Sequence, residues 1–152
     1  MNKNIIIAID GFASTGKSTL AKCLANYLNY TYVDSGSMYR AITYYALVNN
    51  YLPFSKRNLK DFFKVLADVK LNFIFNENLG YSEIYLNNIN IEKEIRSILV
   101  SNHVSSVATI SFIRKHMVNL QKEMSLNKGV VMDGRDIGTV VFPNAELKLF
   151  LN

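Results

Sequence analysis

The stretch G-F-A-S-T-G-K-S at residues 11–18 matches the phosphate-binding pattern G-x-x-x-x-G-K-[S/T] at every fixed position. The apolar run at residues 4–9 predicts a buried strand before it, and Leu20, Leu24 and Leu28 predict a helix after it. The motif requires this context, because loop N–H groups and the positive end of the helix attract phosphate oxygens. The sequence therefore predicts a site for a nucleoside triphosphate.

Two fixed positions of this pattern have a direct chemical role. Lys17 would reach the β- and γ-phosphates, and the Ser18 hydroxyl would be a ligand of Mg²⁺. The predicted ATP-binding residues are consecutive in the chain: Gly11, Phe12, Ala13, Ser14, Thr15, Gly16, Lys17, Ser18 and Thr19.

The composition is that of an ordinary globular protein, with 152 residues, 49% of them hydrophobic and 19% charged. No apolar run has the length of a membrane span, and residue 1 leads into the first strand without a signal-peptide pattern, so we expect a cytoplasmic protein with no membrane contact. Cys23 is the only cysteine, and His103 and His116 are too far apart in the sequence to indicate a metal site. The net charge of +5 is scattered, which suits a nucleotide and gives no reason to expect nucleic acid as a partner.

A second strand at residues 30–33 and a helix at residues 37–50 extend the pattern to strand, loop, helix, strand. This order predicts a right-handed parallel α/β sheet, in which ligands bind at the carboxyl ends of the strands. Candidate binding residues at that edge are Asp34, Ser35, Tyr39 and Arg40. The guanidinium of Arg40 suits bidentate phosphate binding. A solvent-exposed arginine on a helix without a ligand would give the same sequence pattern.

A helical pattern at residues 58–69 is followed by three short strands, at residues 71–75, 82–86 and 89–91. Neighbouring strands without helices between them predict a small antiparallel sheet inserted beside the parallel core. The expected fold class is therefore α/β, with a parallel sheet flanked by helices and a small antiparallel insertion.

Two further helices are expected at residues 96–109 and 110–126, and Arg114 on the second could point to solvent or into a cleft. A short apolar strand at residues 129–132 then ends in Asp133. This is the form of a Walker B element, whose carboxylate supports Mg²⁺ directly or through water. Residues 146–151 predict another parallel strand.

Four segments together resemble the bacterial cytidylate kinase family, nucleoside monophosphate kinases of the phosphate-loop class. They are I-D-G-F-A-S-T-G-K-S-T (9–19), D-S-G-S-M-Y-R (34–40), E-I-R-S (94–97) and D-G-R-D-I-G-T-V-V-F-P-N-A (133–145). The resemblance implies a phosphate-loop core at residues 1–40 and 96–152. It also implies that the inserted region at residues 41–95 binds the monophosphate.

The resemblance implies transfer of the γ-phosphoryl group of ATP, with Mg²⁺, to CMP or dCMP, giving ADP and CDP or dCDP. The catalytic residues would be Lys17, Arg40, Asp133 and Arg135, and the metal ligands Ser18 and Asp133. The residues implied for CMP are Ser35 beside the sugar, Arg40 and Arg135 on the phosphate, Ser105, Arg114 and Asp136 on cytosine, and Tyr39 close by.

The chain also departs from the family, whose members continue past the position of Asn152 into a lid that carries arginines. Because such arginines stabilise the transferring phosphoryl group, we expect this chain alone to be a weak or inactive kinase. A fragment, a truncated gene product and an incompletely recorded chain are all compatible with this ending. A monomer is the simpler expectation for the oligomeric state.

Three other functions remain open on the sequence. A related kinase could act on UMP, AMP or a non-nucleotide acceptor, and a nucleotide-binding protein could bind ATP or CMP without turnover. An RNA-binding protein would account for the positive charge and the tyrosines, although no RNA-recognition motif is present.

Overall fold

The computed structural model describes residues 3–152, and the chain divides into two compact units. The first unit consists of the described part of Met1–Gly36 together with Phe75–Ser82 and Val118–Asn152, and the second of Ser37–Ile74 and Glu83–Met117. The start of the chain, where no signal-peptide pattern is expected, lies outside the described residues. No helix within residues 3–152 is long and apolar enough to cross a bilayer.

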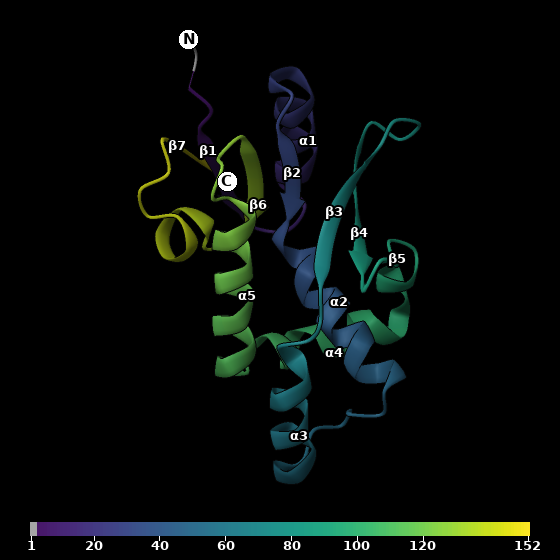
Figure 1. Ribbon diagram of the computed structural model, residues 1–152. Helices are drawn as coiled ribbons and strands as arrows, with labels where there is room; N and C mark the ends of the chain where they lie inside the picture. The colour runs from purple at the N-terminus through teal and green to yellow at the C-terminus, as the bar shows by residue number, and fades with distance from the viewer. Residues whose placement is uncertain (1–2) are drawn as a thin grey trace. The chain divides into compact units, whose positions relative to one another are not determined.

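A four-stranded parallel sheet forms the centre of the first unit (Figure 1). Its strands are β1 (Ile6–Gly11), β2 (Thr31–Asp34), β6 (Val130–Gly134) and β7 (Leu147–Leu151), in the order β2-β6-β1-β7. Strands that are neighbours in this sheet are far apart in the sequence, as crossover connections require. The sheet confirms the predicted α/β class.

Helix α1 (Lys17–Leu28) packs against one face of this sheet. Side chains at alternate positions of a strand point to the same face, so every second residue of β1 can contact the helix. Its contacts form a buried core of Ile7, Ile9, Ala21, Ala25, Tyr32 and Val131. Ala8 and Asp10 alternate with Ile7 and Ile9 along β1 and therefore face the other side of the sheet. There the amides of the short π-helix η2 (Ile137–Val141) bind the carboxylate of Asp10.

The second unit contains most of the remaining helices. They are α2 (Ser35–Val48), α3 (Lys56–Leu66), the 3₁₀ helix η1 (Glu94–Arg96), α4 (Ile98–Ala108) and α5 (Ser111–Met124), of which α2 begins and α5 ends in the first unit. Ser55 caps α3 by accepting from the backbone N–H of Asn58, whose side chain accepts in return from the Ser55 backbone N–H.

The predicted small antiparallel sheet is present and is separate from the parallel one. Its strands β3 (Leu71–Asn76), β4 (Tyr81–Leu86) and β5 (Ile89–Asn90) lie in the order β3-β4-β5. The predicted division into residues 1–40 with 96–152, and 41–95, concerns ligand binding and stays a prediction. The two compact units have other bounds.

Two expected helices are present with shifted starts, and one element was not predicted. The helix expected over residues 96–109 is α4, which begins at Ile98 because the Ser97 side chain accepts from the Val100 N–H and caps it there. The helix expected over residues 37–50 is α2, which starts at Ser35, directly after β2. The π-helix η2 had no counterpart among the predicted elements.

Candidate functional site

The loop at residues 11–18, called the phosphate loop below, curls between β1 and α1. Ser14 and Gly16 adopt left-handed backbone conformations, with φ of 63° and 85°. The Thr15 hydroxyl donates to the carbonyl of Phe12 at 2.8 Å, and Lys17 Nζ donates to the same carbonyl at 3.4 Å. The first turn of α1 holds no acidic side chain that would compete with a phosphate for the N–H groups there.

Gly11 is required by the close approach of a neighbouring strand. A Cβ at this position would lie 2.6 Å from the carbonyl oxygen of Leu151, the residue that pairs with Gly11 in β7. The phosphate loop therefore starts at a point where the sheet leaves no room for a side chain.

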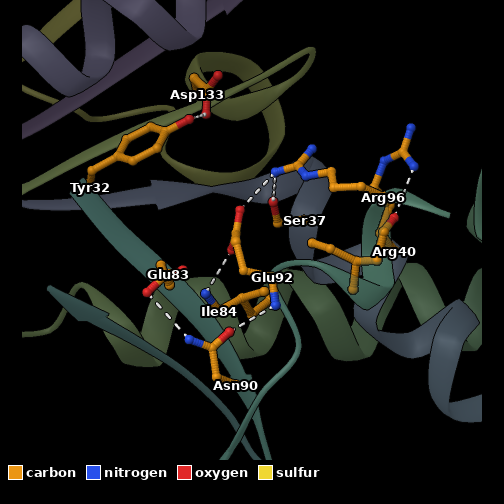
Figure 2. Close-up of polar contacts among 10 residues, drawn as sticks. Tyr32, Ser37, Arg40, Glu83, Ile84, Asn90, Glu92, Arg96 and Asp133 are labelled. Carbon is orange, nitrogen blue, oxygen red and sulfur yellow. Dashed lines mark hydrogen bonds and ion pairs between the residues drawn. The ribbon is translucent and has the colours of Figure 1, made fainter. Parts of the chain in front are cut away.

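The carboxylate of Asp133 lies at the carboxyl end of β6, in register with Ile9 on β1, and is 3% exposed. The Tyr32 hydroxyl donates to its Oδ1 at 3.1 Å, as Figure 2 shows. Burial, and then the neighbouring charge of Asp34, raise the pKa of Asp133 to about 7, against the smaller lowering effects of Tyr32 and Lys17. A cation beside this carboxylate would offset the unfavourable charge.

The oxygen donors here suit a hard divalent cation bound together with phosphate. Ser18 offers a hydroxyl and Asp133 a carboxylate, and Mg²⁺ in phosphoryl-transfer sites takes one or two protein ligands and completes its shell with phosphates and water. Among residues 3–152 no group of three His, Cys, Asp or Glu side chains could hold a metal by itself. The residues present therefore fit a metal that arrives with its nucleotide.

Ser35 and Gly134 connect the ends of β2 and β6. The buried Ser35 hydroxyl donates to the backbone carbonyl of Asp133 at 2.7 Å. A Cβ on Gly134 would lie 2.4 Å from that hydroxyl, so only glycine fits. This contact holds the backbone of Asp133 in place.

Arg135 and Asp136 follow β6 directly and lead into η2, Arg135 exposed and Asp136 half-buried. The two carboxylate oxygens of Asp10, which is 8% exposed, accept from the backbone N–H groups of Ile137 and Gly138, each at 2.8 Å. Asp10 is not among the residues predicted from the sequence, although a charged residue directly after an apolar run and before the phosphate loop is a visible signal.

The remaining residues predicted for CMP belong to the second unit. Arg40 on α2 donates through Nη1 to the carbonyl of Ile95 at 3.2 Å and to the Ser101 hydroxyl at 3.0 Å. Tyr39 is half-buried one residue earlier on the same helix. Ser105 on α4 and Arg114 on α5 are exposed. Their roles stay predictions.

Arg96, in the E-I-R-S segment, takes part in a polar network drawn in Figure 2. Its Nη2 donates to Glu92 Oε1 at 3.0 Å and to the Ser37 hydroxyl at 3.3 Å, while Glu92 Oε2 accepts from the Ile84 N–H at 2.9 Å. Within the second unit this network joins η1, the start of α2 and β4. These contacts give the arginine of the segment a structural role.

Comparison with known proteins identifies the family. The sequence model of the family described as cytidylate kinase matches residues 7–152. Among curated relatives, the cytidylate kinase of Flavobacterium psychrophilum is 62% identical over 98% of this chain and 66% of its own length. The cytidylate kinase of Flavobacterium johnsoniae is 56% identical over 98% of this chain, and that of Porphyromonas gingivalis 48% identical over 99%, each aligned over 65% of its own length.

The chain thus spans slightly less than two thirds of the length of these curated relatives, and the aligned part includes the phosphate loop and Asp133. The chain belongs to the cytidylate kinase family.

Proposed function

We propose that this chain binds ATP with Mg²⁺ and CMP or dCMP, and that it transfers the γ-phosphoryl group to give ADP and CDP or dCDP. The observation that carries the proposal is the phosphate loop beside the buried Asp133, at the ends of the paired parallel strands β1 and β6. Membership of the cytidylate kinase family and the names of the curated relatives support the choice of acceptor.

On the donor side, the N–H groups of the phosphate loop and Lys17 bind the phosphates of ATP. Ser18 and Asp133 hold Mg²⁺, which when bound neutralises phosphate charge. Asp133 binds the cation in its ionised form, and the Tyr32 hydroxyl orients one of its oxygens. Ser35 holds the backbone of the same residue.

On the acceptor side, Arg40 and Arg135 bind the phosphate of CMP, and Ser35 lies beside the sugar. Ser105, Arg114 and Asp136 recognise cytosine, whose exocyclic amine donates hydrogen bonds while its O2 and N3 accept them. Uracil carries an acceptor where cytosine has the amine, so the carboxylate of Asp136 would oppose it. The preference for cytosine follows from that unpaired polar contact.

The chemistry needs no general base, because the acceptor phosphate is already ionised. The side chains act by positioning the two substrates in line and by stabilising the charge of the transferring group with Lys17, Arg40 and Arg135. We also propose that the protein works in the cytoplasm, as a monomer and without a nucleic acid partner.

Single-turnover phosphoryl transfer tests this function, because it detects slow chemistry. The purified chain, in excess over ATP labelled on its γ-phosphate, is mixed with Mg²⁺ and CMP, and labelled CDP is measured over time. We expect CMP-dependent labelling at a rate below about 1 s⁻¹, which Lys17→Ala abolishes. Lys60→Ala, on the exposed side of α3, is the matched control and should match the unchanged chain.

Two results would contradict the proposal. One is label that appears in inorganic phosphate but not in CDP, and the other is CDP formation unaffected by Lys17→Ala. Binding of both nucleotides with no CDP would favour the alternative of a nucleotide-binding protein without turnover.

A further inference from the structure

Asp10 and Asp133 are the next-to-last residues of the paired strands β1 and β6, but they face opposite sides of the sheet. Asp133 lies on the side of α1, because it aligns with Ile9, whose side chain packs against that helix. Asp10 is the next residue along β1, so its side chain points to the other side. The proposed donor site accounts for Asp133 and leaves Asp10 without a role.

The contacts of Asp10 are specific. Its two oxygens accept from two consecutive backbone N–H groups, those of Ile137 and Gly138, which are 127 and 128 residues away in the chain. Both bonds measure 2.8 Å and the side chain is 8% exposed, so these are charge-assisted bonds largely shielded from water. The carboxylate thus fixes the backbone at the start of η2.

Arg135 and Asp136 are the two residues immediately before these amides. Asp136 is the N-cap of η2, and its side chain makes no capping hydrogen bond there, whereas the Asp10 side chain binds the first two amides of η2. Asp10 is also the residue immediately before the phosphate loop. One side chain therefore connects the start of the donor loop with the segment that carries two proposed acceptor ligands.

We propose that Asp10 is a positioning residue for CMP, which sets the place of Arg135 and Asp136 by holding the amides of Ile137 and Gly138. The inference rests on the proposed function, since Arg135 and Asp136 contact CMP only if that function holds. Asp10 itself touches no substrate. Removal of the Asp10 carboxylate should lower the affinity for CMP, the acceptor, and leave the affinity for ATP, the donor, nearly unchanged.

Asp10→Asn is the sharpest variant, because it keeps the size of the side chain. One of the two amide N–H groups would then meet an NH₂ donor instead of an oxygen, and a buried donor would lose its partner. Strand β1 would keep its backbone pairing with Gly134 and Phe150, which supports the phosphate loop. We expect the affinity for CMP to fall at least about tenfold and that for ATP to change less than about twofold.

Isothermal titration with CMP and ATP measures this split, and amide hydrogen exchange of residues 135–141 reports the release of η2. Glu146→Gln is the matched control, since Glu146 is a carboxylate of the same unit that accepts from a backbone N–H, that of Ile6, near the start of β1. It should leave both affinities unchanged. Gly138→Ala disturbs the same contact from the η2 side, because its Cβ would lie 3.3 Å from Asp10 Oδ2. This variant should also lower the affinity for CMP.

The outcomes separate this inference from the proposed function. If the unchanged chain binds CMP and Asp10→Asn binds it equally well, Asp10 is not a positioning residue, although the function stands. Equal weakening of CMP and ATP would also overturn the inference, since it would indicate a general loss of structure. If the unchanged chain is folded and binds no CMP, the proposed function fails and the inference fails with it.

Discussion

Asp133 illustrates how a proposed functional side chain opposes stability. Its burial and the charge of Asp34 raise its pKa to about 7, whereas an aspartate in the unfolded chain titrates near 4. Between these values the folded protein keeps a proton that the unfolded chain releases. The contribution of Asp133 to stability therefore falls as the pH rises from about 4 to about 7, and stays low above that.

Asp133→Asn should for this reason stabilise the fold at neutral pH. The neutral amide still accepts from the Tyr32 hydroxyl and has no charge to desolvate, so we expect a gain of about 1 to 3 kcal/mol at pH 8. The gain should shrink toward zero as the pH approaches about 4. Urea unfolding followed by circular dichroism at pH 5 and pH 8 measures it.

The exposed Asp61 on α3 provides the control, and Asp61→Asn should change stability by less than about 0.5 kcal/mol at either pH. Loss of stability on Asp133→Asn at pH 8 would show that the folded protein favours the charged carboxylate, contrary to this account. Under the proposed function, Asp133→Asn should also bind ATP with Mg²⁺ more weakly than the unchanged chain.

Asp136 provides a second prediction at the residue scale. Asp136→Asn should reduce the preference for CMP over UMP, because an amide can donate to the uracil oxygen that a carboxylate repels. We expect the ratio of the two affinities to fall about tenfold, mainly through tighter UMP binding. Titration of both nucleotides checks it, and an unchanged ratio would exclude Asp136 as the residue that distinguishes the bases.

At the scale of elements, the junction of β2 and β6 depends on the lack of a side chain at residue 134. Gly134→Ala would place a methyl group 2.4 Å from Ser35 Oγ and 2.8 Å from Ile137 Cδ1, so strand or helix must move. We expect a loss of about 1 to 3 kcal/mol in the free energy of unfolding. Chemical denaturation gives the value.

Gly36→Ala is the matched control for that substitution, since it makes the same change inside helix α2. The nearest atom to its new Cβ is the flexible carboxylate of Asp34, at 3.2 Å, and alanine favours helix over glycine. Its stability should stay within about 1 kcal/mol of the unchanged chain. Equal stability of the two variants would mean that the junction has room for a methyl group.

The sequence predicts those elements whose signals are local. The apolar run at residues 4–9 and the leucines of α1 show their periods directly, and the α/β class follows from their order. The π-helix η2 has no such signal, because its start is held by Asp10, 127 residues earlier. For the same reason the sequence indicates Asp133 through its strand but does not reveal what Asp10 contacts.

At the scale of the whole molecule, long-range packing determines the bounds of the two compact units, which local sequence patterns do not reveal. Residues 37–74 and 83–117 form a compact unit of their own, whereas the family resemblance implies an inserted monophosphate-binding region at residues 41–95. The candidate residues follow this division, with Lys17, Asp133 and Arg135 in the first unit and Arg40 and Arg114 in the second. The match to the cytidylate kinase family covers residues 7–152 and so includes residues of both units.

The proposed function requires a site for CMP on this chain. Isothermal titration of the purified chain with CMP, UMP and AMP is the decisive experiment, after circular dichroism has shown that the chain is folded. We expect CMP to bind at least about tenfold more tightly than UMP or AMP. A folded chain that binds none of the three, or binds UMP or AMP as tightly as CMP, would contradict it.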